Sequence, residues 1–236
     1  MTNPSDYYIS RKPLLLKEFD LYVKHTLPVL VRYFGEGNVN ALIAETRREY
    51  EDLIPQLPYI GGKQPFTEFI VFTGMLLAVY RVSKAHGKTV EQTGDLVYEI
   101  GRAFLKSSPA FLTRLFGNMN FSRLYLSRLR KRASESHQRK YPGDYVFNFV
   151  EGDGKTFDYG VDYLECASCK FLAKQGAPEL APYLCPVDIL YSDALGWGLL
   201  RTQTLAEGAE RYDFRFKKGG KTKVAVPASM QNVIDD

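Results

Sequence analysis

The sequence predicts an α+β protein, with an N-terminal helical bundle followed by a small antiparallel sheet covered by helices. The prediction depends on the hydrophobic pattern, which has a helical period up to residue 140 and a period of two after Gly143. The change falls at Tyr141-Pro142-Gly143, a combination typical of a turn. We therefore expect a helical region at 1–140, an α+β region at 141–218 and a flexible tail at 219–236, joined in one integrated domain.

The helical region is expected to contain amphipathic helices around one long apolar helix. Thr89, followed by Gln92 three residues later, is a capping-box signature for the start of one helix. The apolar helix contains Glu68 and Arg81 and is too short and too interrupted to span a membrane, so we interpret it as a buried core helix. The expected helices are 14–34, 39–54, 66 to about 86, 90 to about 106, 109–116 and 121–139.

After Gly143, alternating apolar residues indicate two strand pairs. Tyr145, Phe147 and Phe149 share one face of the first strand, and Gly152-Asp153-Gly154 is expected to form the hairpin turn to the second. The segment 165–194 is broken by glycine and prolines and is expected to be a helical insert between the pairs. The expected strands are 145–151, 157–163, 197–205 and 210–217.

Composition and charge limit the classes of function. The chain has 236 residues, 45% of them hydrophobic and 25% charged, which is ordinary for a globular protein. The net charge of +4 is concentrated between residues 123 and 140, where seven basic residues accompany one acidic residue. This excess is weaker than that of typical nucleic-acid-binding proteins, so no nucleic-acid partner and no membrane span are expected. The segment 121–140 is interpreted as an amphipathic surface helix, with an anionic partner as the alternative.

Cysteine usage indicates a reducing compartment. The chain has three cysteines, an odd number, and its first residues lack the apolar core of a secretory signal. Free or metal-bound thiols fit this pattern better than disulfides do. We therefore expect a cytoplasmic protein.

The three cysteines form the candidate catalytic centre, in which we select Cys185, Asp188 and Cys166. Cys166 and Cys169 are three positions apart and would share one face of a helix. Cys185 precedes Pro186, a residue favoured at the first position of a helix, so Cys185 is expected to be the N-cap residue. The helix dipole there would lower the pKa of the Cys185 thiol and favour a thiolate. Asp188 would face the cap and could transfer protons.

Two other interpretations of the same cysteines are open. Free cysteine is among the most buried residue types, so these thiols could simply pack in an aromatic core. Alternatively, Cys166, Cys169 and Cys185 could bind a divalent metal with Asp188 as a fourth ligand, although structural zinc sites are usually built from cysteine and histidine. No other cofactor is expected.

Arginines on the last two strands could hold an anionic substrate. Arg215 and Arg201 could clamp a carboxylate in bidentate fashion, with Asp213 beside them. The alternative for Arg215 and Asp213 is a solvated outer face of the sheet. Gly61 and Gly62 could let the backbone approach the substrate, or could simply form a turn between helices.

A set of short motifs covers roughly residues 40 to 217. The motifs are Leu57-Pro58-Tyr59-Ile60-Gly61-Gly62-Lys63, Leu76-Leu77-Ala78-Val79-Tyr80-Arg81, Glu165-Cys166, Cys185-Pro186-Val187-Asp188, Thr204-Leu205-Ala206-Glu207-Gly208 and Asp213-Phe214-Arg215-Phe216. In this order and spacing they resemble the L-2-amino-thiazoline-4-carboxylate hydrolase family. Family members often have a cysteine directly before the Asp-Phe-Arg run, where this chain has Tyr212.

The resemblance implies a hydrolase acting on a carbon–nitrogen bond of a cyclic amidine, opening the thiazoline ring to N-carbamoyl-L-cysteine on a bacterial route to L-cysteine. In such a mechanism Cys185 would supply a thiolate or polarise water and Asp188 would transfer protons. Arg215 or Arg201 would hold the carboxylate of a small-molecule substrate. The alternative is a non-catalytic module that binds or senses a small molecule or a metal, and Tyr212 favours it.

Overall fold

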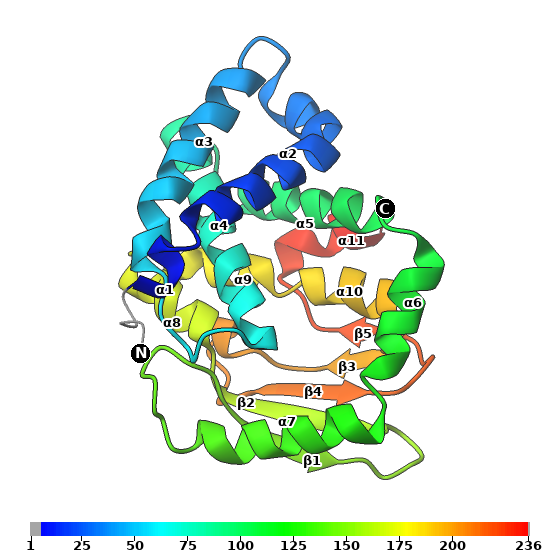
Figure 1. The fold of residues 1–236 in the computed structure, drawn as a ribbon. Helices are drawn as coiled ribbons and strands as arrows, with labels where there is room; N and C mark the ends of the chain where they lie inside the picture. The colour runs from blue at the N-terminus through cyan, green and yellow to red at the C-terminus, as the bar shows by residue number, and fades with distance from the viewer. Residues whose placement is uncertain (1–5, 236) are drawn as a thin grey trace.

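The computed structural model of the chain describes residues 6–235 and confirms an α+β fold. Its single sheet consists of β1 (Val146–Glu151), β2 (Tyr159–Glu165), β3 (Leu199–Arg201), β4 (Tyr212–Phe216) and β5 (Lys223–Val224). Figure 1 shows the sheet at the bottom of the molecule, with β5 uppermost, β1 lowest and most helices above. The N-terminal helices therefore form a layer that rests on the C-terminal sheet.

The sheet is mixed, where the sequence predicted a purely antiparallel one. The strand order is β1-β2-β4-β3-β5, and the first four strands pair antiparallel. β5 pairs with β3 in parallel. The segment 219–235, expected to be a tail, contains β5 and, beyond it, a short C-terminal helix. That helix is tied to the bundle, because Arg102 donates to the carbonyl of Val233 at 2.9 Å.

The helices follow the predicted order with small shifts at their ends. The capping box at Thr89 is confirmed, because the Thr89 hydroxyl accepts from the N–H of Gln92 while the Gln92 side chain accepts from the N–H of Thr89. The helices are α1 (Asp6–Ile9), α2 (Lys12–Phe34), α3 (Val39–Leu53), α4 (Pro65–Ala85), α5 (Val90–Lys106), α6 (Ala110–Met119), α7 (Arg123–Ser136), α8 (Ala167–Lys174), α9 (Ala181–Leu184), α10 (Val187–Leu195) and α11 (Gln231–Asp235), with short 3-10 turns at Ile54–Gln56, Pro178–Leu180, Leu205–Glu207 and Ala228–Met230.

Helix α4 is the central helix of the core, as predicted. By length and composition it could cross a membrane, but 72% of its apolar window is buried inside the protein. Ile70 and Leu77 have no exposed surface. Gly74 lies so close to Leu57 that an added Cβ would be 2.7 Å from its side chain. Close packing of this kind is typical of a helix enclosed by its own domain.

The two faces of the sheet differ in character. Phe147, Tyr159 and Phe216 are buried on the face toward the helices, and the rings of Tyr159 and Phe216 stack with centroids 4.7 Å apart. The opposite face carries the partly exposed ion pair between Asp162 and Arg215. Successive side chains along each strand therefore point alternately to the core and to the solvent. Only predicted site residues on the same face of the sheet can lie close together.

Candidate active site

The three cysteines converge around one tyrosine. Cys166 is the N-cap residue of α8, Cys169 lies in the first turn of that helix, and Cys185 lies between α9 and α10. Tyr212, the first residue of β4, places its hydroxyl oxygen 3.5 Å from the Sγ of Cys169 and 3.3 Å from the Sγ of Cys185. All three cysteines are half-buried and unbridged. The position at which this chain departs from the family pattern is therefore central to the cluster.

Cys169 is the most acidic of the three thiols. A hydrogen bond from Cys166 lowers the pKa of Cys169 to about 7, and the hydrogen bond from Tyr212 acts in the same direction while burial opposes it. Its place in the first turn of α8 also favours a negative charge. The same hydrogen bond and burial raise the pKa of Cys166. Cys166 therefore stays protonated, and its S–H group donates a hydrogen bond to the sulfur of Cys169. The sequence predicted that these two residues share a helix face, but not which of them ionises.

The expectation of an N-cap thiolate at Cys185 is wrong. Cys185 has helical backbone angles (φ −62°, ψ −34°) directly after α9, and the N-cap residue of α10 is Pro186. The Cys185 thiol donates to the carbonyl of Ala181 at 3.5 Å. Burial raises its pKa to about 12, although the charge of Arg201 opposes the rise. The nearly continuous helical path from α9 to α10 removes the free helix end that would have stabilised a thiolate.

Arg201 and Asp188 form an ion pair beside the cysteines. The Arg201 side chain is 0% exposed and donates to a carboxylate oxygen of Asp188 at 2.6 Å. It also donates to the carbonyls of Cys185 and Ala225, at 3.3 and 2.9 Å. The Asp188 side chain is 33% exposed, and burial raises its pKa to about 6 while Arg201 opposes the rise. Near neutral pH Asp188 can therefore accept a proton.

The helical layer contributes a second set of polar groups that the sequence did not reveal. The hydroxyl of Ser168, the residue before Cys169, lies 3.1 Å from the hydroxyl of Tyr145 and 2.8 Å from that of Thr73 in α4. Thr73 in turn donates to the carbonyl of Phe69. These residues are far apart in sequence, so spacing gives no sign that they meet. Helix α4 therefore contacts α8, the helix that carries Cys169, through the hydroxyl of Ser168.

Arg215 and Asp213 lie away from the cysteines. Leu199 is paired with Phe216, so Arg201 points to the helical side while Arg215 points to the opposite face. Arg215 donates to Asp162 at 2.7 Å, and Asp213 accepts from the backbone N–H groups of residues 202 and 203. The predicted joint clamp of Arg215 and Arg201 on one carboxylate is therefore geometrically excluded, and the solvated-face interpretation fits Arg215.

Gly61 and Gly62 lie in the loop before α4, where aromatic rings surround them. Their φ angles are +109° and +79°, a region that favours glycine. An added Cβ would be 3.1 Å from the Tyr141 ring at Gly61 and 3.3 Å from the Tyr59 hydroxyl at Gly62. The turn interpretation accounts for both glycines, and their neighbours are these aromatic residues rather than the cysteines.

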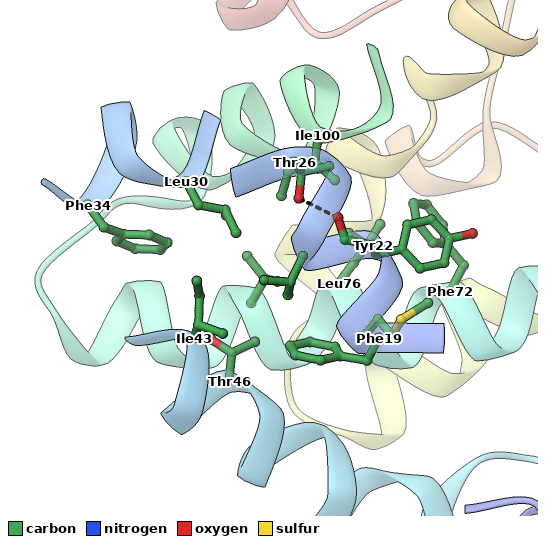
Figure 2. A pocket seen from close by; sticks show the side chains of 13 residues that line it. Phe19, Tyr22, Thr26, Leu30, Phe34, Ile43, Thr46, Phe72, Leu76 and Ile100 are labelled. Carbon is green, nitrogen blue, oxygen red and sulfur yellow. Dashed lines mark hydrogen bonds between the residues drawn. The ribbon is translucent and has the colours of Figure 1, made fainter. Parts of the chain in front are cut away.

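Within residues 6–235, no group of three or more histidine, cysteine or acidic side chains, the cysteine cluster included, has an arrangement that could hold a metal ion. An apolar pocket of about 50 Å³ lies between α2, α3, α4 and α5 (Figure 2). The hydroxyls of Thr26 and Thr46 in its lining donate to carbonyls of their own helices. The residues that line the pocket include no thiol and no carboxylate.

The fold and this cluster define an α+β protein in which three thiols gather around Tyr212. The chain belongs to the L-2-amino-thiazoline-4-carboxylic acid hydrolase family, whose model matches residues 68–216, more than half of the 236 residues. The match confirms the family resemblance seen in the motifs and covers every residue of the cluster, from Thr73 in α4 to Tyr212 in β4. Gly61 and Gly62 lie outside it. Neither the curated proteins nor the solved structures contain a match to this chain.

Proposed function

We propose that this protein is a hydrolase that opens the ring of a cyclic amidine bearing a carboxylate, with L-2-amino-thiazoline-4-carboxylate as the substrate to test first. The family is named for this hydrolase activity. The observation that carries the proposal is Cys169, a half-buried thiol with a pKa of about 7 that is hydrogen-bonded by Cys166 and Tyr212. A thiol partly ionised at neutral pH is a nucleophile suited to an amidine carbon.

The atom balance of this reaction identifies the bond that breaks. N-carbamoyl-L-cysteine retains both nitrogens of the amidine, so ring opening cleaves the bond between the amidine carbon and the ring sulfur. The resemblance implied cleavage of a carbon–nitrogen bond, but this product requires cleavage of the carbon–sulfur bond, with a thiolate as the leaving group. Water supplies the carbonyl oxygen of the product, and its two protons go to the ring nitrogen and the released sulfur.

In the proposed mechanism Cys169 attacks the amidine carbon, and the ring sulfur leaves with its electron pair. This gives an isothiourea linked to Cys169. Asp188 then removes a proton from water, which attacks the same carbon and releases the Cys169 thiolate together with the carbamoyl product. Arg201 is a positioning residue, because its buried guanidinium holds the Asp188 carboxylate at 2.6 Å. Tyr212 and Cys166 hold the thiolate.

The test is incubation of the purified protein with L-2-amino-thiazoline-4-carboxylate, followed by mass spectrometry for N-carbamoyl-L-cysteine. Cys169→Ala is the informative variant, and Cys185→Ala is the matched control with an equally small change. We expect product from the native protein and from Cys185→Ala, and a trace at most from Cys169→Ala. Full turnover by a folded Cys169→Ala protein would remove the nucleophile assignment.

A non-catalytic binding module is the second candidate, favoured by the hydroxyl of Tyr212 between two sulfurs where the family often has a cysteine. Calorimetric titration with the same compound separates the two functions. Binding without product, by folded protein, supports the module and overturns the hydrolase.

A further inference from the structure

The most exposed apolar side chains of the protein are concentrated on one short segment. Among residues 6–235, the five large hydrophobic side chains with the greatest exposure all lie between residues 111 and 124. Phe111 is 71% exposed and Phe116 61%. The other three are Leu115, Met119 and Leu124. Concentrations of exposed apolar side chains are more often interaction sites than other parts of a protein surface are.

The exposed stripe is one side of a helix whose other side is packed tightly. Gly117 of α6 lies against α10, and an added Cβ at this position would be 1.8 Å from the carbonyl oxygen of Leu195. Phe111, Leu115, Phe116 and Met119 occupy the remaining surface of α6, at spacings of four, one and three residues. Figure 1 shows α6 at one edge of the molecule, linking α5 to α7. The stripe therefore faces outward because α6 is fixed on α10.

The same segment carries a strong local charge. Residues 100–134 contain eight lysines and arginines and no acidic residue. Four of these basic residues are exposed and form no ion pair within the described part of the chain: Lys106, Arg114, Arg123 and Arg128. Arg123 and Arg128 lie on α7 next to the exposed Leu124, and Arg114 lies on α6 itself. The apolar stripe thus has an unneutralised basic border.

We propose that α6 and the start of α7 bind the surface of an anionic lipid bilayer. Aromatic and aliphatic side chains on one helix face enter the interface of a bilayer, and adjacent lysines and arginines bind anionic headgroups. A second copy of this chain fits less well, because a two-fold interface places the same patch of each subunit against itself and would bring two basic borders together. Nucleic acid would leave the phenylalanines and leucines exposed.

This proposal goes beyond the hydrolase proposal and does not depend on it. It nevertheless connects the two regions, because α6 packs on α10, the helix that carries Asp188. Lipid binding would place the cysteine cluster close to a bilayer without any membrane-spanning segment.

The test is flotation of the full chain with vesicles of phosphatidylcholine alone or with about one-third phosphatidylserine, at low and physiological salt. Phe111→Ser/Phe116→Ser removes the apolar contact, and Arg123→Gln/Arg128→Gln removes two charges. Leu14→Ser/Leu21→Ser is the matched control, because both leucines are exposed on α2 outside the patch. Circular dichroism and thermal melting confirm that each variant is folded.

We expect the native protein and the control to float with anionic vesicles and not with neutral ones. Since each basic residue near an anionic surface contributes roughly fivefold in affinity, the double arginine variant should bind about 25-fold more weakly. The double phenylalanine variant should not float. Absence of binding by the native protein overturns the proposal, as does unchanged binding by the phenylalanine variant. A dimer seen by light scattering that Phe111→Ser/Phe116→Ser dissociates would assign the patch to a second copy instead.

Discussion

Arg201 and Arg215 lie on neighbouring strands, and each donates to one carboxylate at nearly the same distance, 2.6 Å to Asp188 and 2.7 Å to Asp162. Their surroundings differ. The Arg201 side chain is 0% exposed, and two backbone carbonyls satisfy further N–H groups of its guanidinium. Arg215 is 22% exposed and lies along the outer face of the sheet. The strand alternation that separates them places one pair beside the cysteines and the other beside solvent.

This difference shows that similar ion pairs can have different consequences. A buried charge that loses its partner is costly because neither water nor protein solvates it, whereas a partly exposed charge turns to water. The pair on the helical side therefore fixes the position of Asp188 at the site. The pair on the outer face joins β2 to β4 at the side of the sheet away from the cysteines.

The largest expected effect separates the two arginines by stability. Arg201→Met should lower the free energy of unfolding by about 3 kcal/mol, because the half-buried Asp188 carboxylate and the two carbonyls lose their donor. Arg215→Met should cost less than about 1 kcal/mol. Urea denaturation of the two variants measures both values, and equal losses would contradict the distinction between the two faces.

The next effect compares two cysteines of the same cluster. Cys169→Ala should reduce kcat/KM for L-2-amino-thiazoline-4-carboxylate by at least about 100-fold, at the lower end of what a positioned reacting group contributes. Cys185→Ala should reduce it by less than about tenfold, because burial raises the pKa of Cys185 to about 12 and keeps this thiol protonated beside Tyr212. Steady-state kinetics of both variants provide the comparison. A larger loss of kcat/KM for Cys185→Ala than for Cys169→Ala would identify Cys185 as the nucleophile, as the sequence predicted.

A third test concerns the pH dependence on the acid side. The base Asp188, with a pKa of about 6, and the nucleophile Cys169, with a pKa of about 7, both lose their reactive forms as the pH falls. Activity should therefore rise from pH 5 to pH 8 through two ionisations. In Asp188→Asn the activity should be about 10- to 100-fold lower, and only the ionisation of Cys169 near pH 7 should remain in its pH profile. A profile with both ionisations in the variant would exclude Asp188 as the base.

The smallest effect tests Tyr212. Tyr212→Phe keeps the ring in the core but removes one hydrogen bond to Cys169, so the pKa of the Cys169 thiol should rise. Loss of one hydrogen bond of ordinary strength, about 0.5–1.5 kcal/mol, should make alkylation of the half-ionised Cys169 thiol about two- to sevenfold slower at pH 7. Iodoacetamide labelling followed by peptide mass spectrometry measures this rate. An unchanged rate would mean that Tyr212 only packs.

The fold could be predicted where its signal is periodic and local. The change of period after Gly143, the capping box at Thr89 and the shared face of Tyr145, Phe147 and Phe149 all follow from short segments, and the structure agrees with each. β5 contains only Lys223–Val224, too short for an alternating pattern, so its parallel pairing with β3 could not be foreseen. The parallel strand is the reason that the sheet is mixed.

The sequence predicted part of the candidate site, namely the three cysteines with Asp188 and Arg201, but not the roles of these residues. The spacing of Cys166, Cys169 and Cys185 indicated a cluster, which the structure contains. The Cys-Pro pair suggested a helix start at Cys185, but the preceding helical turn of α9 continues into it. Contacts such as that of Ser168 with Thr73 join segments 95 residues apart, and only the tertiary structure brings them together.

The most direct test of the thiol assignment is the pH dependence of alkylation at each cysteine of the native protein. Limited iodoacetamide labelling between pH 5 and pH 10, read out by peptide mass spectrometry, gives a midpoint for each site. We expect Cys169 to react first, with a midpoint near pH 7, while Cys166 and Cys185 remain largely unmodified over this range. A low midpoint at Cys185, or a midpoint for Cys169 above that of an ordinary thiol near 8.5, would contradict the assignment of Cys169 as the activated nucleophile.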